Sequence, residues 1–264
     1  MDVRAHLPHL PPLWREGLFG LEAAALLRSP VWRGEDLPRG AGRPVLLIPG
    51  FLAGDNSLGA MTHWLRGLGY RTKSAGIRTN VACSAALTDS LESRLECMAE
   101  KTGDKVAIVG QSRGGIIARA LAVRRPDLVS GIVTLGSPTK SMLHVHPAVL
   151  GSIGVVGLLG ALHVRPAFTL KCLRGDCCLK FRDELRTPPS DDVGFVSVYS
   201  RRDGIVDWHA CVDPFATRNV EVRSSHCGMS LNADVYKIVA NSLSEFAGED
   251  DAALDDDIRW LKAA

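Results

Sequence analysis

Short apolar runs and longer segments of helical periodicity alternate along most of this chain. An apolar run that ends at Gly or Pro is typical of a buried parallel strand, and a 3.6-residue apolar period is typical of a helix. Strands are expected at 44–50, 69–74, 105–110, 129–137, 195–200 and 219–225, and helices at 57–67, 84–102, 113–125 and 233–247. This alternation predicts βαβ units, and hence an α/β fold with a mostly parallel, doubly wound sheet.

The first part of the chain, residues 1–43, lies outside this alternation and is rich in Pro and Arg. It contains one helical patch, WREGLFGLEAAALLRS, in which Leu18, Leu21, Ala25 and Leu26 have the spacing of an amphipathic helix. We interpret residues 1–43 as an N-terminal arm that packs on the main domain or on a membrane face.

A second interruption, at about 138–194, contains no convincing strand but includes the apolar, glycine-rich stretch GSIGVVGLLGALHV. Three interpretations stay open: a buried helix of an inserted cap, a mobile apolar lid over a substrate cleft, and a short membrane span. The main domain is then expected over 44–264, with this cap or lid as an insert.

Composition narrows the class of protein. A length of 264 residues suits one large α/β domain, and the hydrophobic and charged fractions, 46% and 23%, are those of an ordinary globular protein. The net charge of +2 is too small to suggest nucleic-acid binding. The N-terminus lacks a basic segment followed by an apolar run, so we expect a cytoplasmic protein, with membrane association through the insert as an alternative.

The seven cysteines include a cluster, CLRGDCC, that is similar to a metal knuckle. No fourth ligand lies at knuckle spacing from Cys172, Cys177 and Cys178, so we expect no metal and no other cofactor. In a reducing compartment these residues are free thiols. In an oxidising one, Cys172 has two candidate partners in the cluster, and Cys211 has Cys227.

The clearest chemical motif is Gly-Gln-Ser-Arg-Gly, centred on Ser112. It follows an apolar strand and precedes a helix, which is the setting of a serine nucleophile on a sharp strand-to-helix turn. Such a turn needs small neighbours, because bulky side chains would collide with the strand and the helix. Ser112 is therefore the candidate nucleophile rather than part of an ordinary turn.

A serine nucleophile needs a general base, and the base needs an orienting acid. His226 directly follows the last predicted strand, at the carboxyl edge of the sheet where sites of open α/β folds form. The acid should follow strand 195–200, where Asp203 and Asp207 compete. We favour Asp203, which allows a tight turn at the sheet edge, and expect Asp207 to cap the short segment that begins at Trp208.

The negative oxygen of an acyl-transfer intermediate needs fixed hydrogen-bond donors. The backbone amide of Arg113, at a helix N-terminus, is one candidate. The other should come from the loop IPGFLAG, with Phe51 as the first choice and Leu52 as the second. The side chain of Arg113 is expected to form a salt bridge with a nearby acid.

Substrate contacts are expected from Gln111 and Leu52 beside the nucleophile. The uncharged segment Pro147 to Leu162 suits an apolar acyl chain, and Val155 and Leu158 are its candidate contacts.

Four stretches, IPGFLAG, GQSRG, YSRRDGIV and SSHCGM, together resemble the motifs of α/β-hydrolases, and more narrowly those of bacterial triacylglycerol lipases and esterases. The resemblance covers roughly residues 44 to 247. It implies an α/β-hydrolase fold with a helical lid or cap, and it places the catalytic acid at Asp203.

The expected function is hydrolysis of carboxylic esters with apolar acyl groups through Ser112, His226 and Asp203. The partner is a small-molecule or lipid ester, with lipid-surface contact through the insert as a further expectation. An acyltransferase or thioesterase with the same triad is one alternative. A non-catalytic, membrane-associated binding module is another.

Overall fold

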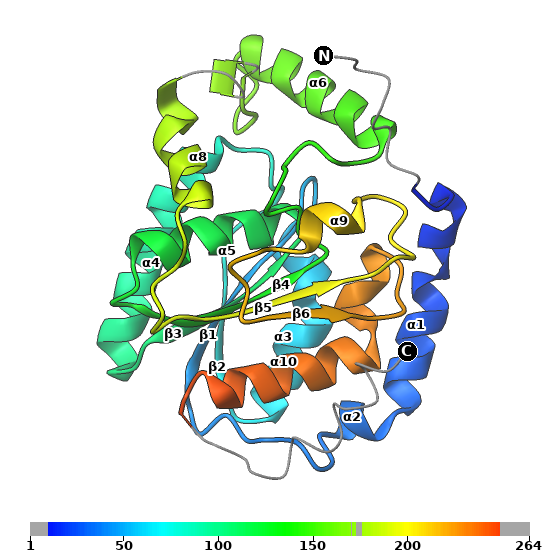
Figure 1. The fold of residues 1–264 in the computed structure, drawn as a ribbon, viewed down its shortest axis with the longest axis vertical. Helices are drawn as coiled ribbons and strands as arrows, with labels where there is room; N and C mark the ends of the chain where they lie inside the picture. The colour runs from blue at the N-terminus through cyan, green and yellow to red at the C-terminus, as the bar shows by residue number, and fades with distance from the viewer. Residues whose placement is uncertain (1–9, 170, 173–175, 249–264) are drawn as a thin grey trace.

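The computed structural model describes residues 10–169, 171–172 and 176–248. Its centre is a six-stranded sheet in the order β2-β1-β3-β4-β5-β6, and all five neighbouring pairs run parallel (Figure 1). The strands are β1 (Pro44–Ile48), β2 (Arg71–Ser74), β3 (Val106–Gln111), β4 (Val129–Leu135), β5 (Gly194–Tyr199) and β6 (Arg218–Glu221). Every residue of β1 and β3 is buried, because helices cover both faces of the sheet. The predicted fold class is confirmed.

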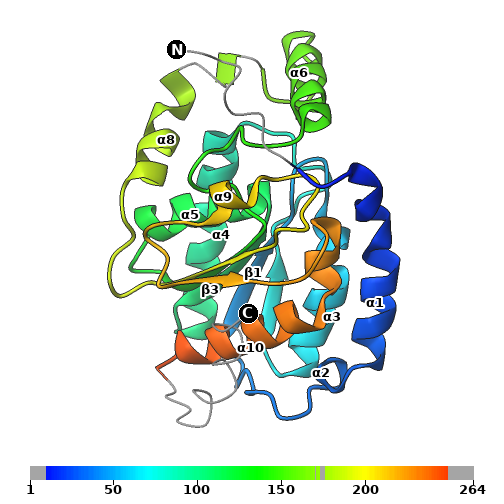
Figure 2. The ribbon, with the colours of Figure 1, turned by 45° about the vertical axis from the view of Figure 1, so that its right-hand side comes forward.

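Two layers of helices enclose the sheet (Figures 1 and 2). On one face, α3 (Gly59–Gly67) and α10 (Ala233–Glu245) form a core with β1, β3, β4 and β5, and part of the N-terminal segment packs against it. On the other face, α4 (Ser84–Thr102), α5 (Arg113–Arg124) and α8 (Leu179–Arg186) form a second core. The helix α4 has the bounds predicted from the sequence, and it ends at Gly103 in the left-handed conformation.

The last strand is shorter than predicted. The pattern NVEVRSS suggested a strand through residue 225, whereas β6 ends at Glu221. The amide of Ser225 donates to Glu22 of the N-terminal segment, 2.9 Å away, rather than to the neighbouring strand. The amide of Val222 still donates to Tyr199 O at 2.8 Å, and beyond it a segment about 200 residues earlier in the chain holds Ser224 and Ser225.

The insert contributes α6 (Pro147–Ala161), the short 3₁₀ helix η4 (Asp176–Cys178) and α8. Figure 1 shows α6 at the upper end of the molecule, beyond the sheet. Val149, Ser152 and Ile153 of α6 line the same cavity as Gly50 and Ser112, which follow β1 and β3. The helix thus lies over the carboxyl edge of the sheet. Within the described ranges, no helix is both long enough and apolar enough to cross a bilayer.

The described part of the N-terminal segment forms the 3₁₀ helix η2 (Leu13–Leu18), α1 (Phe19–Arg28) and α2 (Pro30–Arg33). The helix was predicted, but its packed face was not: Leu26 is buried, whereas Leu21 is 70% exposed and Leu18 41% exposed. The face that meets the domain carries Glu22, whose carboxylate accepts hydrogen bonds from Ser224 and Ser225. Residues 1–9 of the expected arm and 249–264 of the expected main domain lie outside the described residues.

Candidate active site

Ser112 stands at the junction of β3 and α5 with φ 51° and ψ −122°. A non-glycine residue in this region stores backbone strain, and such strain gathers at functional sites. The turn closes tightly around it, because a Cβ at Gly114 would run into the backbone of Ile48, and one at Gly115 would run into the Ser137 side chain. The glycines therefore permit the close approach that holds the serine in this conformation.

His226 and Asp203 meet at the carboxyl edge of the sheet. His226 Nδ1 lies 2.6 Å from Asp203 Oδ2, and both residues are buried. The second carboxylate oxygen, Oδ1, accepts from the amides of Ile205 at 2.8 Å and Val206 at 2.7 Å. These two donors fix the carboxylate, which in turn fixes the plane of the imidazole. Among the described residues, no hydrogen bond is formed by Nε2 of this imidazole.

Asp207 has a different task. Its side chain accepts from the backbone amide of His209 at 3.0 Å and caps α9 (Trp208–Cys211). It also lies 2.7 Å from the Nδ1 atom of His209, an exposed ring. The structure thus joins Asp203, not Asp207, to His226, and the expected cap is confirmed.

Two opposing effects set the pKa of the buried His226 imidazole. Burial lowers the pKa, but the charge of Asp203 and its hydrogen bond, with a smaller contribution from Glu16, raise it above the ordinary 6.5. Ser112 and His226 line the same cavity. A hydrogen bond between them is not among those formed by the described residues, and contacts of this kind often tighten only when substrate binds.

The two amides expected to bind an oxyanion are those of Phe51 and Arg113. Within the described part of the chain, no protein acceptor is hydrogen-bonded to either amide. By contrast, the amide of Leu52, the second candidate, points to the carbonyl of Asn80 at 3.4 Å. The structure therefore leaves Phe51 and Arg113 available as donors beside Ser112.

Among the described residues, the side chain of Arg113 does not form the expected salt bridge with an acid. Its guanidinium donates to Asn80 O at 2.8 Å, to Asn80 Oδ1 at 2.9 Å, to the carbonyl of Ala82 and to Ser84 Oγ at 3.1 Å. Asn80, itself buried, donates to Pro49 O at 2.8 Å. Arg113 and Asn80 thus hold the loop that carries Phe51, a task the sequence did not reveal.

The serine opens onto a cavity of about 600 Å³. Its wall is mainly apolar and includes Phe51, Leu52, Met142, Val149, Ile153 and Phe181. Gln111 and Leu52 lie in this wall, as expected. Val155 and Leu158 do not: they are 59% and 58% exposed on the outer side of α6. In a helix that is apolar all round, the sequence does not show which side faces inward.

Comparison with known proteins gives this architecture a named fold. The family model described as "alpha/beta hydrolase fold" matches residues 65–154. The chain has the α/β-hydrolase fold.

Solved structures with this fold agree. A lipase of Bacillus licheniformis in its mature form superposes with a TM-score of 0.59 at 17% identity, covering 79% of this chain and 94% of that one. A metagenome-derived lipolytic enzyme gives 0.54 at 16% identity, covering 81% and 96%. A methylesterase from Arabidopsis gives 0.52 at 15% identity, covering 77% and 99%. None of the curated proteins matches the sequence significantly.

On this α/β-hydrolase fold, the N-terminal segment adds a carboxylate, Glu16, that connects the two loops behind the site. Glu16 Oε1 accepts from the amides of Gly204 at 2.9 Å and His226 at 3.1 Å, and Oε2 accepts from Cys227 at 2.9 Å. Gly204 belongs to residues 199–206, the acid loop, which carries Asp203. The other two amides belong to residues 224–229, the histidine loop, which carries His226. Glu16 therefore ties the loop of Asp203 to the loop of His226.

Glu22 holds the start of the same histidine loop. It accepts from the amide of Ser225 at 2.9 Å, from the Ser225 hydroxyl at 2.8 Å and from the Ser224 hydroxyl. On the other side, Gln111 Nε2 donates to His226 O at 3.2 Å. The only sequence signal for Glu22 was a charge among the apolar residues of a helix, and this pattern did not indicate a partner 200 residues away.

Proposed function

We propose that this protein is a serine hydrolase that cleaves carboxylic esters with apolar acyl groups. The α/β-hydrolase fold, with lipases and esterases among its structural neighbours, supports a hydrolase. The observation that carries the proposal is the 2.6 Å contact of His226 Nδ1 with Asp203, behind a cavity that a strained Ser112 shares with His226.

In the proposed reaction, His226 Nε2 takes the proton of the Ser112 hydroxyl as the oxygen attacks the ester carbonyl. Asp203 stabilises the imidazolium, and the amides of Phe51 and Arg113 donate to the carbonyl oxygen as it becomes negative. His226 then protonates the leaving alcohol. Water, deprotonated by the same imidazole, releases the acid from the acyl-enzyme.

The apolar wall of the cavity supports an apolar acyl group. Each methylene that is transferred from water to this wall contributes about 0.8 kcal/mol, which is roughly a fourfold gain in kcat/KM. In a series of p-nitrophenyl esters of increasing acyl length, kcat/KM should therefore rise by about this factor per methylene until the 600 Å³ cavity is filled. A preference for short charged or sugar esters would contradict the substrate class but not the nucleophile.

Ser112→Ala tests the nucleophile. We expect loss of p-nitrophenyl ester turnover and of labelling by a fluorophosphonate probe, while the circular dichroism spectrum stays that of the wild type. Ser152→Ala is a matched control, because Ser152 lines the same cavity from α6 and its hydroxyl donates to a backbone carbonyl, Ala148 O, at 3.0 Å. Undiminished turnover in Ser112→Ala would refute the assignment.

The outward side of α6 supports contact with aggregated lipid substrate. Val155 and Leu158 are 59% and 58% exposed there, and Leu162, directly after the helix, is 67% exposed. The proposal predicts higher activity on emulsified than on monomeric ester, and loss of this difference in Leu158→Glu. Equal activity on both physical forms in the wild type would argue against lipid contact.

A further inference from the structure

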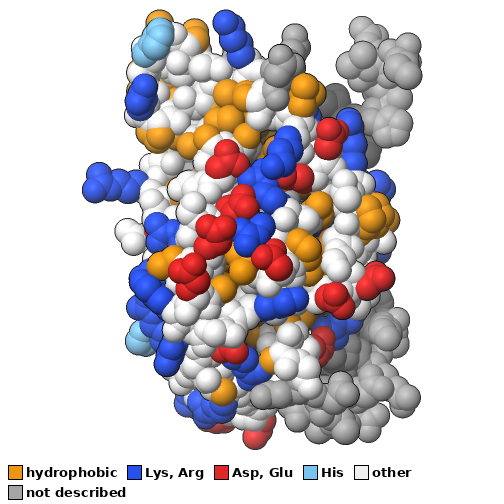
Figure 3. Space-filling model, turned by 90° about the vertical axis from the view of Figure 1, so that its left-hand side faces the viewer, with side chains coloured by type: hydrophobic (Ala, Val, Ile, Leu, Met, Phe, Trp, Pro, Cys, Tyr) orange, Lys and Arg blue, Asp and Glu red, His pale blue; other side chains and the backbone are white. Residues whose placement is uncertain are grey.

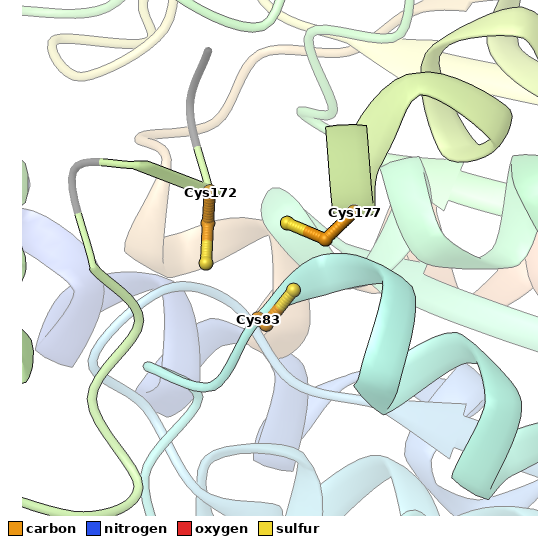
Figure 4. Close-up of side chains that lie close together, drawn as sticks. All are labelled: Cys83, Cys172 and Cys177. Atoms are coloured by element: carbon orange, nitrogen blue, oxygen red, sulfur yellow. The ribbon is translucent and has the colours of Figure 1, made fainter. Parts of the chain in front are cut away.

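Four cysteine thiols from distant parts of the chain gather beside the cavity. Cys83 precedes α4, whereas Cys172, Cys177 and Cys178 belong to the insert. Cys83 Sγ lies 3.7 Å from Cys178 Sγ although the two residues are 95 positions apart, and Cys177 Sγ lies 3.8 Å from Cys178 Sγ. The sulfur atoms of Cys83, Cys172 and Cys177 all lie within 4.8 Å of one another. Figure 4 shows these three side chains pointing to a common space.

The spacing is that of a thiolate metal site. All seven cysteines are free thiols in the structure. In tetrahedral zinc sites the Zn–S distance of about 2.3 Å places neighbouring sulfurs about 3.8 Å apart. The two Sγ–Sγ distances of 3.7 and 3.8 Å already match this value. The three pairs within the trio of Cys83, Cys172 and Cys177 lie within 4.8 Å, so each needs to close by at most about 1 Å. Rotation of the cysteine side chains about χ1 supplies movements of this size.

The sequence spacing agrees. Four residues separate Cys172 from Cys177, within the two to four that usually separate paired cysteine ligands of structural zinc. Sequence alone could not complete the set, since Cys83 lies far upstream. The fold supplies it at the N-terminus of α4, where helix geometry also favours a negative group.

A partly buried positive charge, the Arg113 guanidinium, lies beside this cluster. Within the described residues, the hydrogen-bond partners of the Arg113 guanidinium are neutral oxygen atoms. Burial lowers the pKa of Arg113 to about 10, and negative charge on Cys83, Cys178 or Cys172 would act against that lowering. A zinc ion with four thiolates carries a net charge of −2, which neutral thiols do not provide. A metal centre would therefore compensate a partly buried cation.

We propose that Cys83, Cys172, Cys177 and Cys178 bind one Zn²⁺ ion as four thiolates and release their protons on binding. The ion is structural, because the four protein ligands leave no open position for substrate or water. It joins the insert, through Cys172 and the turn at η4, to the start of α4. It thereby fixes the wall of the cavity, to which Cys172 and Cys178 contribute.

The test is metal content. The full chain is expressed with zinc in the medium and purified with a reducing agent and without chelator. Mass spectrometry of the metals should then find about one Zn²⁺ per chain. Cys83→Ser and Cys172→Ser should each lower this content at least about tenfold. Cys97→Ser is the matched control, because Cys97 is an exposed thiol on α4 outside the cluster, and it should retain the zinc.

A second measurement does not depend on the folding of any variant. The wild-type chain, stripped of metal under reducing conditions and titrated with Co²⁺, should develop the strong visible bands of a tetrahedral thiolate site. The proposal is overturned if the reduced protein binds neither zinc nor cobalt, if Cys97→Ser loses as much zinc as Cys83→Ser, or if peptide mapping after anaerobic purification finds a disulfide between Cys83 and Cys178.

Discussion

The three hydrogen bonds of Glu16 make it the most informative residue to change outside the cavity. In Glu16→Ala, the amides of Gly204 and His226 lose a charged acceptor at buried positions, whereas the amide of the exposed Cys227 gains water instead. Hydrogen bonds to charged groups contribute about 1.5–3 kcal/mol each and are not additive, so we expect a loss of about 2–4 kcal/mol in the free energy of unfolding.

The same change should reduce catalysis by a different route. Once the loops of Asp203 and His226 are no longer tied together, the imidazole is held less firmly, and misplacement by about 1 Å can cost roughly 100-fold. We expect kcat/KM for a p-nitrophenyl ester to fall about 10- to 100-fold in Glu16→Ala. Glu16→Gln keeps an oxygen acceptor and should retain most of this activity. Glu16 raises the pKa of His226. The acidic limb of the pH profile of Glu16→Ala should therefore lie at lower pH than that of the wild type.

Glu35→Ala provides the control for these measurements, since Glu35 lies in the same N-terminal segment but its partner is the exposed Arg33. Unfolding is followed by tryptophan fluorescence in urea, and kinetics by nitrophenolate release. If Glu16→Ala matched Glu35→Ala in both the unfolding free energy and kcat/KM, the hydrogen bonds of Glu16 would not position the histidine loop, and the reasoning would be refuted.

Three further predictions concern the site itself. Gly136 has φ +55°, and a Cβ there would lie 3.1 Å from both Asp203 Oδ2 and His226 Nδ1. Gly136→Ala should therefore lower both kcat and the free energy of unfolding. A wild-type kcat in this variant would contradict the close approach. Only neutral His226 acts as a base, and its pKa is raised, so kcat/KM should fall as the pH drops through a value above 6.5; a limb centred below 6.5 would contradict this. Ile153 lines the cavity, whereas Val155 faces solvent, so Ile153→Trp should reduce turnover of long acyl esters more than Val155→Trp does. Equal effects of the two substitutions would contradict the inward orientation of Ile153.

The sequence predicted the sheet and the residues at its carboxyl edge because these are local signals. An apolar run, a breaker and a polar residue directly after a strand are read within about ten positions, and parallel strands bring their ends to one edge. For this reason Ser112, Asp203 and His226 could be nominated together. Their roles in catalysis stay a prediction, but the contact between Asp203 and His226 is present.

What could not be predicted depends on contacts between distant segments. Glu22 looks like an ordinary helix charge, and its partners Ser224 and Ser225 look like the end of a strand; only the docking of α1 joins them. The inward face of α6 was undetermined for another reason. Its 15 residues contain no charged side chain, so no hydrophobic period distinguishes Ile153 from Val155.

Arg113 connects these distant contacts to the chemistry. In the proposed reaction its amide donates to the oxyanion, while its guanidinium holds Asn80, which in turn holds the loop of Phe51. The same guanidinium lies 5.7 Å from the ring of Phe168 in the insert, and burial lowers its pKa to about 10. A planar guanidinium can donate to Asn80 and stack near the Phe168 ring at the same time, whereas a lysine ammonium cannot. Through this side chain, a metal in the cysteine cluster would stabilise the loop that carries one of the oxyanion donors, and the order of the insert and the geometry of the proposed reaction would depend on each other.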